Sequence, residues 1–296
     1  MAGAVGEGHL IVAESGVLYV VATPIGNMGD ISVRAREILA GVGAVAAEDT
    51  RHSGRLLREL GLERPLVSLH EHNERARVVE LVGRLRGGES IALVSDAGTP
   101  LVSDPGYLLV AAAIEAGVVV TPIPGPSAAI AALSAAGLPC DRFCFEGFLP
   151  ARAAARRRRL AELAAETRTL VIYEAPHRIA ECLADLVAAC GATRRACVAR
   201  EITKRFETFY RGNLGELAER AKNDADLARG EAVILIEGAE QADPGAAQLD
   251  ETLSVLLRHL PPSAAAAAAA SLMGVRRNDA YARALAITKD KSPDQA

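Results

Sequence analysis

The sequence of 296 residues contains no tryptophan, and aromatic residues make up only 3% of it. This scarcity disfavours a protein that binds single-stranded nucleic acid mainly by stacking bases on aromatic rings. Positive charge is not in excess either, because 33 Lys and Arg face 37 Asp and Glu, a formal net charge of −4. Non-specific polyanion binders usually carry net positive charge, so any contact with RNA must come from local basic patches.

Cysteine and metal-binding patterns are also sparse. The five Cys are an odd number and form no CxxC pair, which indicates reduced thiols instead of a disulfide framework or a zinc site. His70 and His72 stand two residues apart, a spacing that does not place them on one helix face, and no third ligand accompanies them. The sequence predicts no metal site. It also lacks the dinucleotide-binding, P-loop, metalloprotease and nucleophile-elbow motifs.

No targeting or membrane segment stands out. The N-terminus lacks a basic segment followed by an apolar one, and the most apolar run, 118–138, is interrupted by three prolines. We therefore expect a cytoplasmic protein.

Short apolar runs alternate with amphipathic helical runs over the first half of the chain. This rhythm predicts a mostly parallel α/β sheet with helices on both faces. The expected strands are 17–22, 44–47, 66–69, 91–94 and 118–121, and the expected helices are 31–40, 51–60, 74–86, 107–116 and 127–136.

After Leu138-Pro139 the pattern changes, and it predicts a second α/β domain with a mixed sheet. The expected strands are 142–148, 169–173, 195–201, 207–211 and 232–237, and the expected helices are 151–165, 176–189 and 214–222. A small helical unit follows a polar linker, with helices at 248–259, 263–273 and 278–286. We thus expect a flexible tail at 1–16, domains at 17–138 and 139–239, and a C-terminal helical unit at 246–287.

Glycine and proline gather in three loops that follow predicted strands, at 23–30, 95–106 and 122–128. The carboxyl ends of parallel strands flank the ligand crevice of an open sheet. Each loop alone would be read as an ordinary turn. Three on one rim favour a small-molecule site that is built largely from backbone groups.

Several long blocks carry a resemblance to a known family. LYVVATPIGNMGDIS (18–32), AAEDTRHSGRLL (46–57), HEHNE (70–74), IALVSDAGTPLVSDPG (91–106) and YEAPHR (173–178) resemble the ribosomal RNA small subunit methyltransferase I family, within the tetrapyrrole methylase superfamily. The resemblance spans about 17–287. It implies a two-domain tetrapyrrole-methylase fold, S-adenosylmethionine (SAM) as methyl donor, and methylation of a cytidine ribose 2′-hydroxyl in the decoding region of 16S rRNA. It also implies a homodimer.

The resemblance and the loop pattern together indicate cofactor-binding residues. Helix N-termini favour anions, so the amides that open the helix after Pro126 suit the SAM carboxylate. Asp104 has an alternative role as the cap of the following helix. The expected set is Pro24, Gly26, Asp96, Gly98, Thr99, Ser103, Asp104, Gly106, Gly125, Pro126, Ser127, Ala128, Tyr173 and Ala232.

Methyl transfer to a hydroxyl needs alignment and a more nucleophilic oxygen, so a general base or a polarising cation should lie near it. The candidates we rank first are Glu201 and Lys204, which are also spaced for a structural ion pair. Asp49 follows them. Residue types alone do not choose the base.

Arginine is the expected RNA-binding residue. The run at 152–159 favours phosphate binding, although a solvated helix face is the usual explanation of a charge run. For Arg276 and Arg277 in the C-terminal helical unit, a role in packing is an equal alternative to RNA binding. The expected RNA-binding set is Arg51, His52, Arg152, Arg156, Arg157, Arg158, Arg159, Arg276 and Arg277.

Two other functions stay open at this point. One is SAM-dependent methylation of a tetrapyrrole or corrinoid intermediate, which the same superfamily core would support. The other is a non-catalytic SAM-binding factor for ribosome assembly, because binding and turnover would use the same loops.

Overall fold

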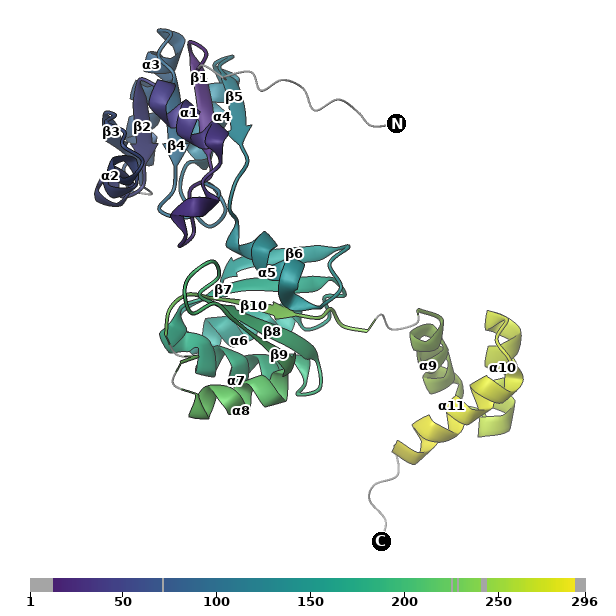
Figure 1. Ribbon diagram of the computed structural model, residues 1–296. Coiled ribbons are helices and arrows are strands. Elements are labelled where there is room, and N and C mark those ends of the chain that lie inside the picture. The colour runs from purple at the N-terminus through teal and green to yellow at the C-terminus, as the bar shows by residue number, and fades with distance from the viewer. Residues whose placement is uncertain (1–12, 71, 225, 228, 241–243, 291–296) are drawn as a thin grey trace, which may run out of the picture. The chain divides into compact units, whose positions relative to one another are not determined.

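The computed structural model describes residues 13–70, 72–224, 226–227, 229–240 and 244–290 (Figure 1). The chain divides into two compact units, with the boundary between Ala239 and Glu240. Residues 1–12 of the expected N-terminal tail and 241–243 of the expected linker lie outside the described residues.

The first sheet is parallel throughout and has the strand order β3-β2-β4-β1-β5. Its strands are β1 (Val17–Val21), β2 (Ala44–Ala47), β3 (Leu66–Ser68), β4 (Ile91–Val94) and β5 (Val119–Ile123). The prediction of a parallel sheet is confirmed. Pro122 is tolerated within β5 because this is an edge strand, where a missing N–H costs no ladder bond on the open side.

Helices cover both faces of this sheet. They are α1 (Val33–Gly41), α2 (Thr50–Glu59), α3 (Glu74–Arg86) and α4 (Tyr107–Glu115). Along β1, Val17, Tyr19 and Val21 pack with α1 and α2, whereas Leu18 packs with α3 and α4. The period of two explains why the three central strands, β1, β2 and β4, are apolar at every position: each face meets a helical layer.

The second sheet is mixed, as predicted, with the order β6-β7-β10-β8-β9 and only the pair β6–β7 parallel. Its strands are β6 (Phe143–Phe148), β7 (Thr169–Glu174), β8 (Arg195–Arg200), β9 (Thr208–Asn213) and β10 (Ala232–Ile236). The expected strands 195–201 and 207–211 form the antiparallel pair β8–β9.

One face of the second sheet packs against α6 (Ala153–Leu163), α7 (Ile179–Cys190) and α8 (Leu214–Asn223), and the other against α5 (Ala128–Ala136) (Figure 1). In β10, Ile234 and Ile236 face the first layer, and Val233 and Leu235 face α5. Since α5 precedes residue 139, the chain leaves the first sheet earlier than the predicted domain boundary. The segment between β5 and α5 therefore connects the two sheets at the rim where the glycine-rich loops lie.

The C-terminal unit consists of α9 (Pro244–Leu256), α10 (Pro262–Met273) and α11 (Arg277–Asp290). Its core combines leucines of α9 with small side chains of α10 and α11: Leu249, Leu253, Ala265, Ala266, Ala269, Ala280 and Ala284. Alanines allow the helices to approach closely, as the alanine run in the sequence indicates. Within the described residues, no helix has the length and apolar character needed to cross a membrane.

Candidate active site

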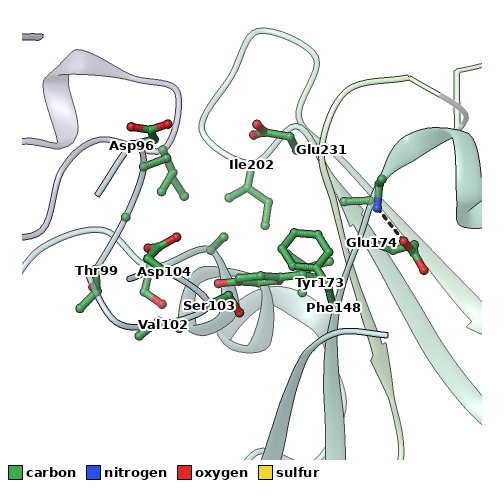
Figure 2. A pocket seen from close by; sticks show the side chains of 18 of the residues that line it. Asp96, Thr99, Val102, Ser103, Asp104, Phe148, Tyr173, Glu174, Ile202 and Glu231 are labelled. Carbon is green, nitrogen blue, oxygen red and sulfur yellow. Dashed lines mark hydrogen bonds between the residues drawn. The ribbon is translucent and has the colours of Figure 1, made fainter. Parts of the chain in front are cut away.

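A cavity of about 390 Å³ lies where the rim loops of the first sheet meet the second sheet (Figure 2). A volume of this size is typical of small-molecule sites. The lining comes from the loop after β4, the start of α5, the second-sheet residues Phe148, Tyr173 and Ala232, and Ile202, which follows β8. The three loops singled out in the sequence thus build or support one cavity.

Backbone and hydroxyl hydrogen bonds tie these loops together. Thr23 and Gly98 form an antiparallel bridge with N···O distances of 2.9 and 3.1 Å, and Thr99 Oγ1 donates to the Pro126 carbonyl at 3.0 Å. Leu101 and Ser103 have left-handed backbones, with φ of 72° and 71°. Such strain in residues other than glycine concentrates at binding sites, where the surroundings hold it in place.

A residue far away in the sequence caps the start of α4. The Glu74 carboxylate accepts the N–H groups of Gly106 and Leu108, both at 3.0 Å. Gly106 is the N-cap residue, so the alternative role of Asp104 as a helix cap is wrong. Asp104 lines the cavity instead, and burial, with a smaller contribution from Asp96, raises the pKa of its carboxyl.

The N-terminus of α5 forms another wall. Ser127 is its N-cap residue, without a side-chain cap hydrogen bond, and the Tyr173 hydroxyl accepts the Ala129 N–H at 3.1 Å. The Tyr173 ring meets Phe145 and Phe148 edge-on, at centroid distances of 5.0 and 5.6 Å. Burial raises the pKa of Tyr173. This phenol stays neutral and fixes the helix end against the second sheet.

Most of the expected cofactor-binding residues line this cavity: Asp96, Gly98, Thr99, Ser103, Asp104, Ser127, Ala128, Tyr173 and Ala232. Pro24 and Gly26 line a neighbouring cavity. Gly106, Gly125 and Pro126 stand behind the wall, where Gly106 donates its N–H to Glu74 and Pro126 accepts from Thr99. The apolar lining by Phe148, Ile202 and Val233 was not predicted, because strand and loop patterns do not tell which apolar side chains face a cavity.

Glu201 and Lys204 do come together, in an ion-pair cluster with Glu231. Lys204 Nζ lies 2.9 Å from Glu201 Oε1 and 2.9 Å from Glu231 Oε2, and Glu201 also accepts the Glu231 N–H at 2.9 Å. Burial opposes the charge on Glu201 and on Lys204, but the mutual hydrogen bonds prevail, so the pKa of Glu201 is lowered and that of Lys204 is raised. Both groups remain ionised.

The Lys204 side chain lies across the backbone of Gly26. A Cβ atom at Gly26 would be 2.5 Å from Lys204 Cγ, and the φ of 149° also favours glycine. Gly26 therefore makes room for Lys204 at the rim.

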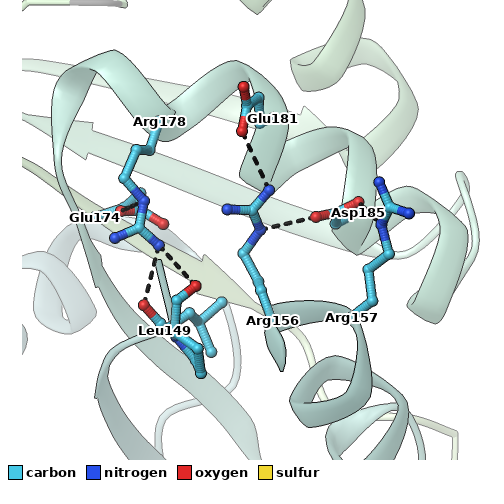
Figure 3. Close-up of polar contacts among 8 residues, drawn as sticks. Leu149, Arg156, Arg157, Glu174, Arg178, Glu181 and Asp185 are labelled. Carbon is cyan, nitrogen blue, oxygen red and sulfur yellow. Dashed lines mark hydrogen bonds and ion pairs between the residues drawn. The ribbon is translucent and has the colours of Figure 1, made fainter. Parts of the chain in front are cut away.

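Other polar candidates already have structural partners. Asp49 is the N-cap residue of α2 and pairs with Arg51, which lowers the pKa of the Asp49 carboxyl and makes it a weak base. Glu174, another carboxylate at this cavity, has a buried side chain that pairs with Arg178 at 3.2 Å (Figures 2 and 3). Arg178 in turn donates to the Leu149 carbonyl, so the pair positions the loop after β6.

The arginine run corrects one prediction (Figure 3). Arg156 is only 2% exposed, and its Nε and Nη2 atoms bind Asp185 at 2.7 Å and Glu181 at 3.3 Å, so it is not available to RNA. Arg157 also binds Asp185, at 2.9 Å, and Arg159 pairs with Glu146 and Glu162.

The remaining expected RNA contacts are exposed. In the described part of the chain, Arg152 and Arg158 form no ion pair. Arg276 and Arg277 are exposed at the start of α11, and His52 is exposed on α2.

Two family models match this chain. One, described as Tetrapyrrole (Corrin/Porphyrin) Methylases, matches residues 17–218, and the other, described as RsmI C-terminal HTH domain, matches residues 243–288. The chain is 56% identical to the ribosomal RNA small subunit methyltransferase I of Xylella fastidiosa strain Temecula1, over 90% of this chain and 98% of the relative. It is 53% identical to the protein of that name from Pseudomonas aeruginosa, over 92% and 97%.

Solved structures show the same fold at low identity. The methyltransferase CobJ aligns with a TM-score of 0.57 and 21% identity, over 78% of this chain and 98% of that one. A uroporphyrin-III C-methyltransferase from Thermus thermophilus, complexed with S-adenosyl homocysteine, aligns with a TM-score of 0.52 and 18% identity, over 75% and 97%.

Proposed function

The chain belongs to the ribosomal RNA small subunit methyltransferase I family of the tetrapyrrole methylases, and from this membership we infer that it is a SAM-dependent 16S rRNA methyltransferase. The acceptor is the ribose 2′-hydroxyl of a cytidine in the decoding region. Identity above 50% over nine-tenths of the chain is the observation that carries this function.

The residues of the 390 Å³ cavity fit SAM. The start of α5 suits its carboxylate, since Ser127 and Ala128 line the cavity at a helix N-terminus. The partly buried Asp104 suits a cationic or hydroxyl group, which would offset the burial that raises its pKa. Ile202, Val233 and Phe148 offer apolar surface for a flat base. When bound, SAM supplies an activated methyl group with a good leaving group.

The protein's task is then to orient the ribose hydroxyl and to favour loss of its proton. Lys204 keeps its proton because its pKa is raised, so it acts as a cation that makes a nearby hydroxyl more acidic, not as the base. Glu201, with a lowered pKa, holds Lys204 in place. Asp49, held by Arg51, positions α2.

RNA phosphates would meet the exposed arginines Arg152, Arg158, Arg276 and Arg277, and the residues at the start of α2. Each such contact adds affinity without reading sequence. Because the substrate is ribosomal RNA, we place the reaction in the cytoplasm.

We also propose a homodimer. On α4 and β5, Tyr107, Ile114 and Val119 leave large apolar surfaces exposed beside an open sheet edge. Apolar patches of this kind commonly mark protein interfaces. Sedimentation equilibrium of the wild type and of Ile114→Glu tests the dimer: the wild type should sediment as a dimer and the variant as a monomer.

The activity is tested by methyl transfer from labelled SAM to small ribosomal subunits from cells that lack this gene, followed by nuclease mapping. Label at a single cytidine ribose is expected. No label, with SAM binding confirmed by calorimetry, would refute the rRNA assignment.

A further inference from the structure

A second cavity, of about 370 Å³, lies next to the first. The two cavities share a wall made of Ile25, Asp96, Ala97 and Glu231. The two cavities therefore adjoin at these residues. Transfer between two bound partners requires neighbouring sites, because the reacting atoms must come into direct contact.

One face of α2 forms a side of this cavity. His52, Arg55, Leu56 and Glu59 all line it, and their spacing of three, four and seven residues puts them on one helix face. The Asp49 cap fixes where this helix begins. The opposite side contains Lys204, which lies against Gly26.

The charges in the cavity suit a nucleotide. Arg55 and His52 are exposed and, among the described residues, neither takes part in an ion pair. Arg55 offers its guanidinium, and His52 its ring nitrogens, to a phosphate, whereas Lys204 is already paired with Glu201 and Glu231. Glu59 and Asp96 supply carboxylates for hydroxyl and amine donors, which a ribose and a base carry.

We propose that this second cavity receives the acceptor nucleotide, with its ribose hydroxyl beside Lys204 and the residues shared by the two cavities, and its phosphate on Arg55. The proposal rests on the proposed function and extends it to a named binding site. A cavity of about 370 Å³ admits one nucleotide, not a duplex.

The test compares Arg55→Ala with Arg58→Ala, a matched control. Both arginines are exposed on α2, but Arg58 does not line the cavity. Arg55→Ala is expected to raise the KM for small ribosomal subunits about tenfold and to lower the slope of log Kd against log salt by about one. Its SAM affinity by calorimetry and its melting temperature should equal those of the wild type. Arg58→Ala should match the wild type throughout.

A second variant, His52→Ala, removes the side chain one turn earlier on the same face of α2, and it should also raise the KM for small ribosomal subunits. If the wild type methylates the subunit while Arg55→Ala and His52→Ala keep its KM and its salt slope, the cavity is not the acceptor site and the proposed function stands. If the wild type itself transfers no label, the proposed function fails. A loss of SAM affinity in Arg55→Ala would overturn the assignment to the acceptor.

Discussion

Replacing Arg156 by alanine separates a structural role from an RNA-binding one. The guanidinium is buried between Asp185 and Glu181, and its removal leaves Asp185 with Arg157 as its remaining partner. Breaking a buried ion pair by removing one partner costs about 3–5 kcal/mol. Because Arg157 still neutralises Asp185, we expect the lower end, about 3 kcal/mol, which lowers the melting temperature of a domain of this size by roughly 6–12 °C.

The assay is thermal unfolding of Arg156→Ala beside Arg158→Ala, an exposed neighbour on the same helix. Arg158→Ala should have the melting temperature of the wild type. The ion pairs with the two arginines outweigh burial and lower the pKa of Asp185, so its stabilising contribution is present above pH 3.8 and is lost as the pH falls through its pKa in the folded state. The gap between Arg156→Ala and the wild type should therefore narrow in acid. If Arg156→Ala keeps the melting temperature of the wild type but binds small ribosomal subunits more weakly, the structural role of Arg156 is refuted.

Two further predictions concern the cofactor cavity. Asp104→Asn should weaken SAM binding at least about tenfold by calorimetry, because one hydrogen bond to a charged group is lost. The free protein should melt no lower, because burial penalises the charged carboxyl. Unchanged SAM affinity would show that Asp104 does not contact the cofactor. Tyr173→Phe leaves the Ala129 N–H unpaired, which should lower the free energy of unfolding by about 1–3 kcal/mol in denaturant. It should also weaken SAM binding, measured by calorimetry. A variant as stable as the wild type would mean that water replaces the hydroxyl.

Local patterns were sufficient for the fold. Alternating strand and helix runs predicted every strand of both sheets, because their apolar residues must be buried against helices on either side. The arginine run shows where composition misleads. Arg156, Leu160 and Leu163 are the buried residues of α6, and they stand four and seven residues apart. Helical spacing therefore placed Arg156 on the core face, while its charge suggested the surface.

Contacts between loops that lie far apart in the sequence could not be predicted from the sequence. Nothing local to Glu74 shows that its carboxylate caps α4, and nothing local to Gly26 shows that Lys204 lies across it. Both depend on how the sheets bring far segments together. The loops after the strands were found because strand ends share a rim, but their side-chain partners are set by tertiary packing.

The two adjoining cavities bear on why no strongly basic side chain is needed at this site. Methyl transfer from a good leaving group requires mainly that the acceptor oxygen be held in line, and positioning alone supplies several kcal/mol. In the shared wall, Asp96 is a half-buried carboxylate that faces both cavities, and it already accepts the Asp49 N–H at 3.1 Å. We propose that a carboxylate such as Asp96 suffices as proton acceptor if the Lys204 cation makes the hydroxyl more acidic. We therefore propose that catalysis at this site depends more on how α2, the loop after β4 and Lys204 position the acceptor than on the basicity of any one residue.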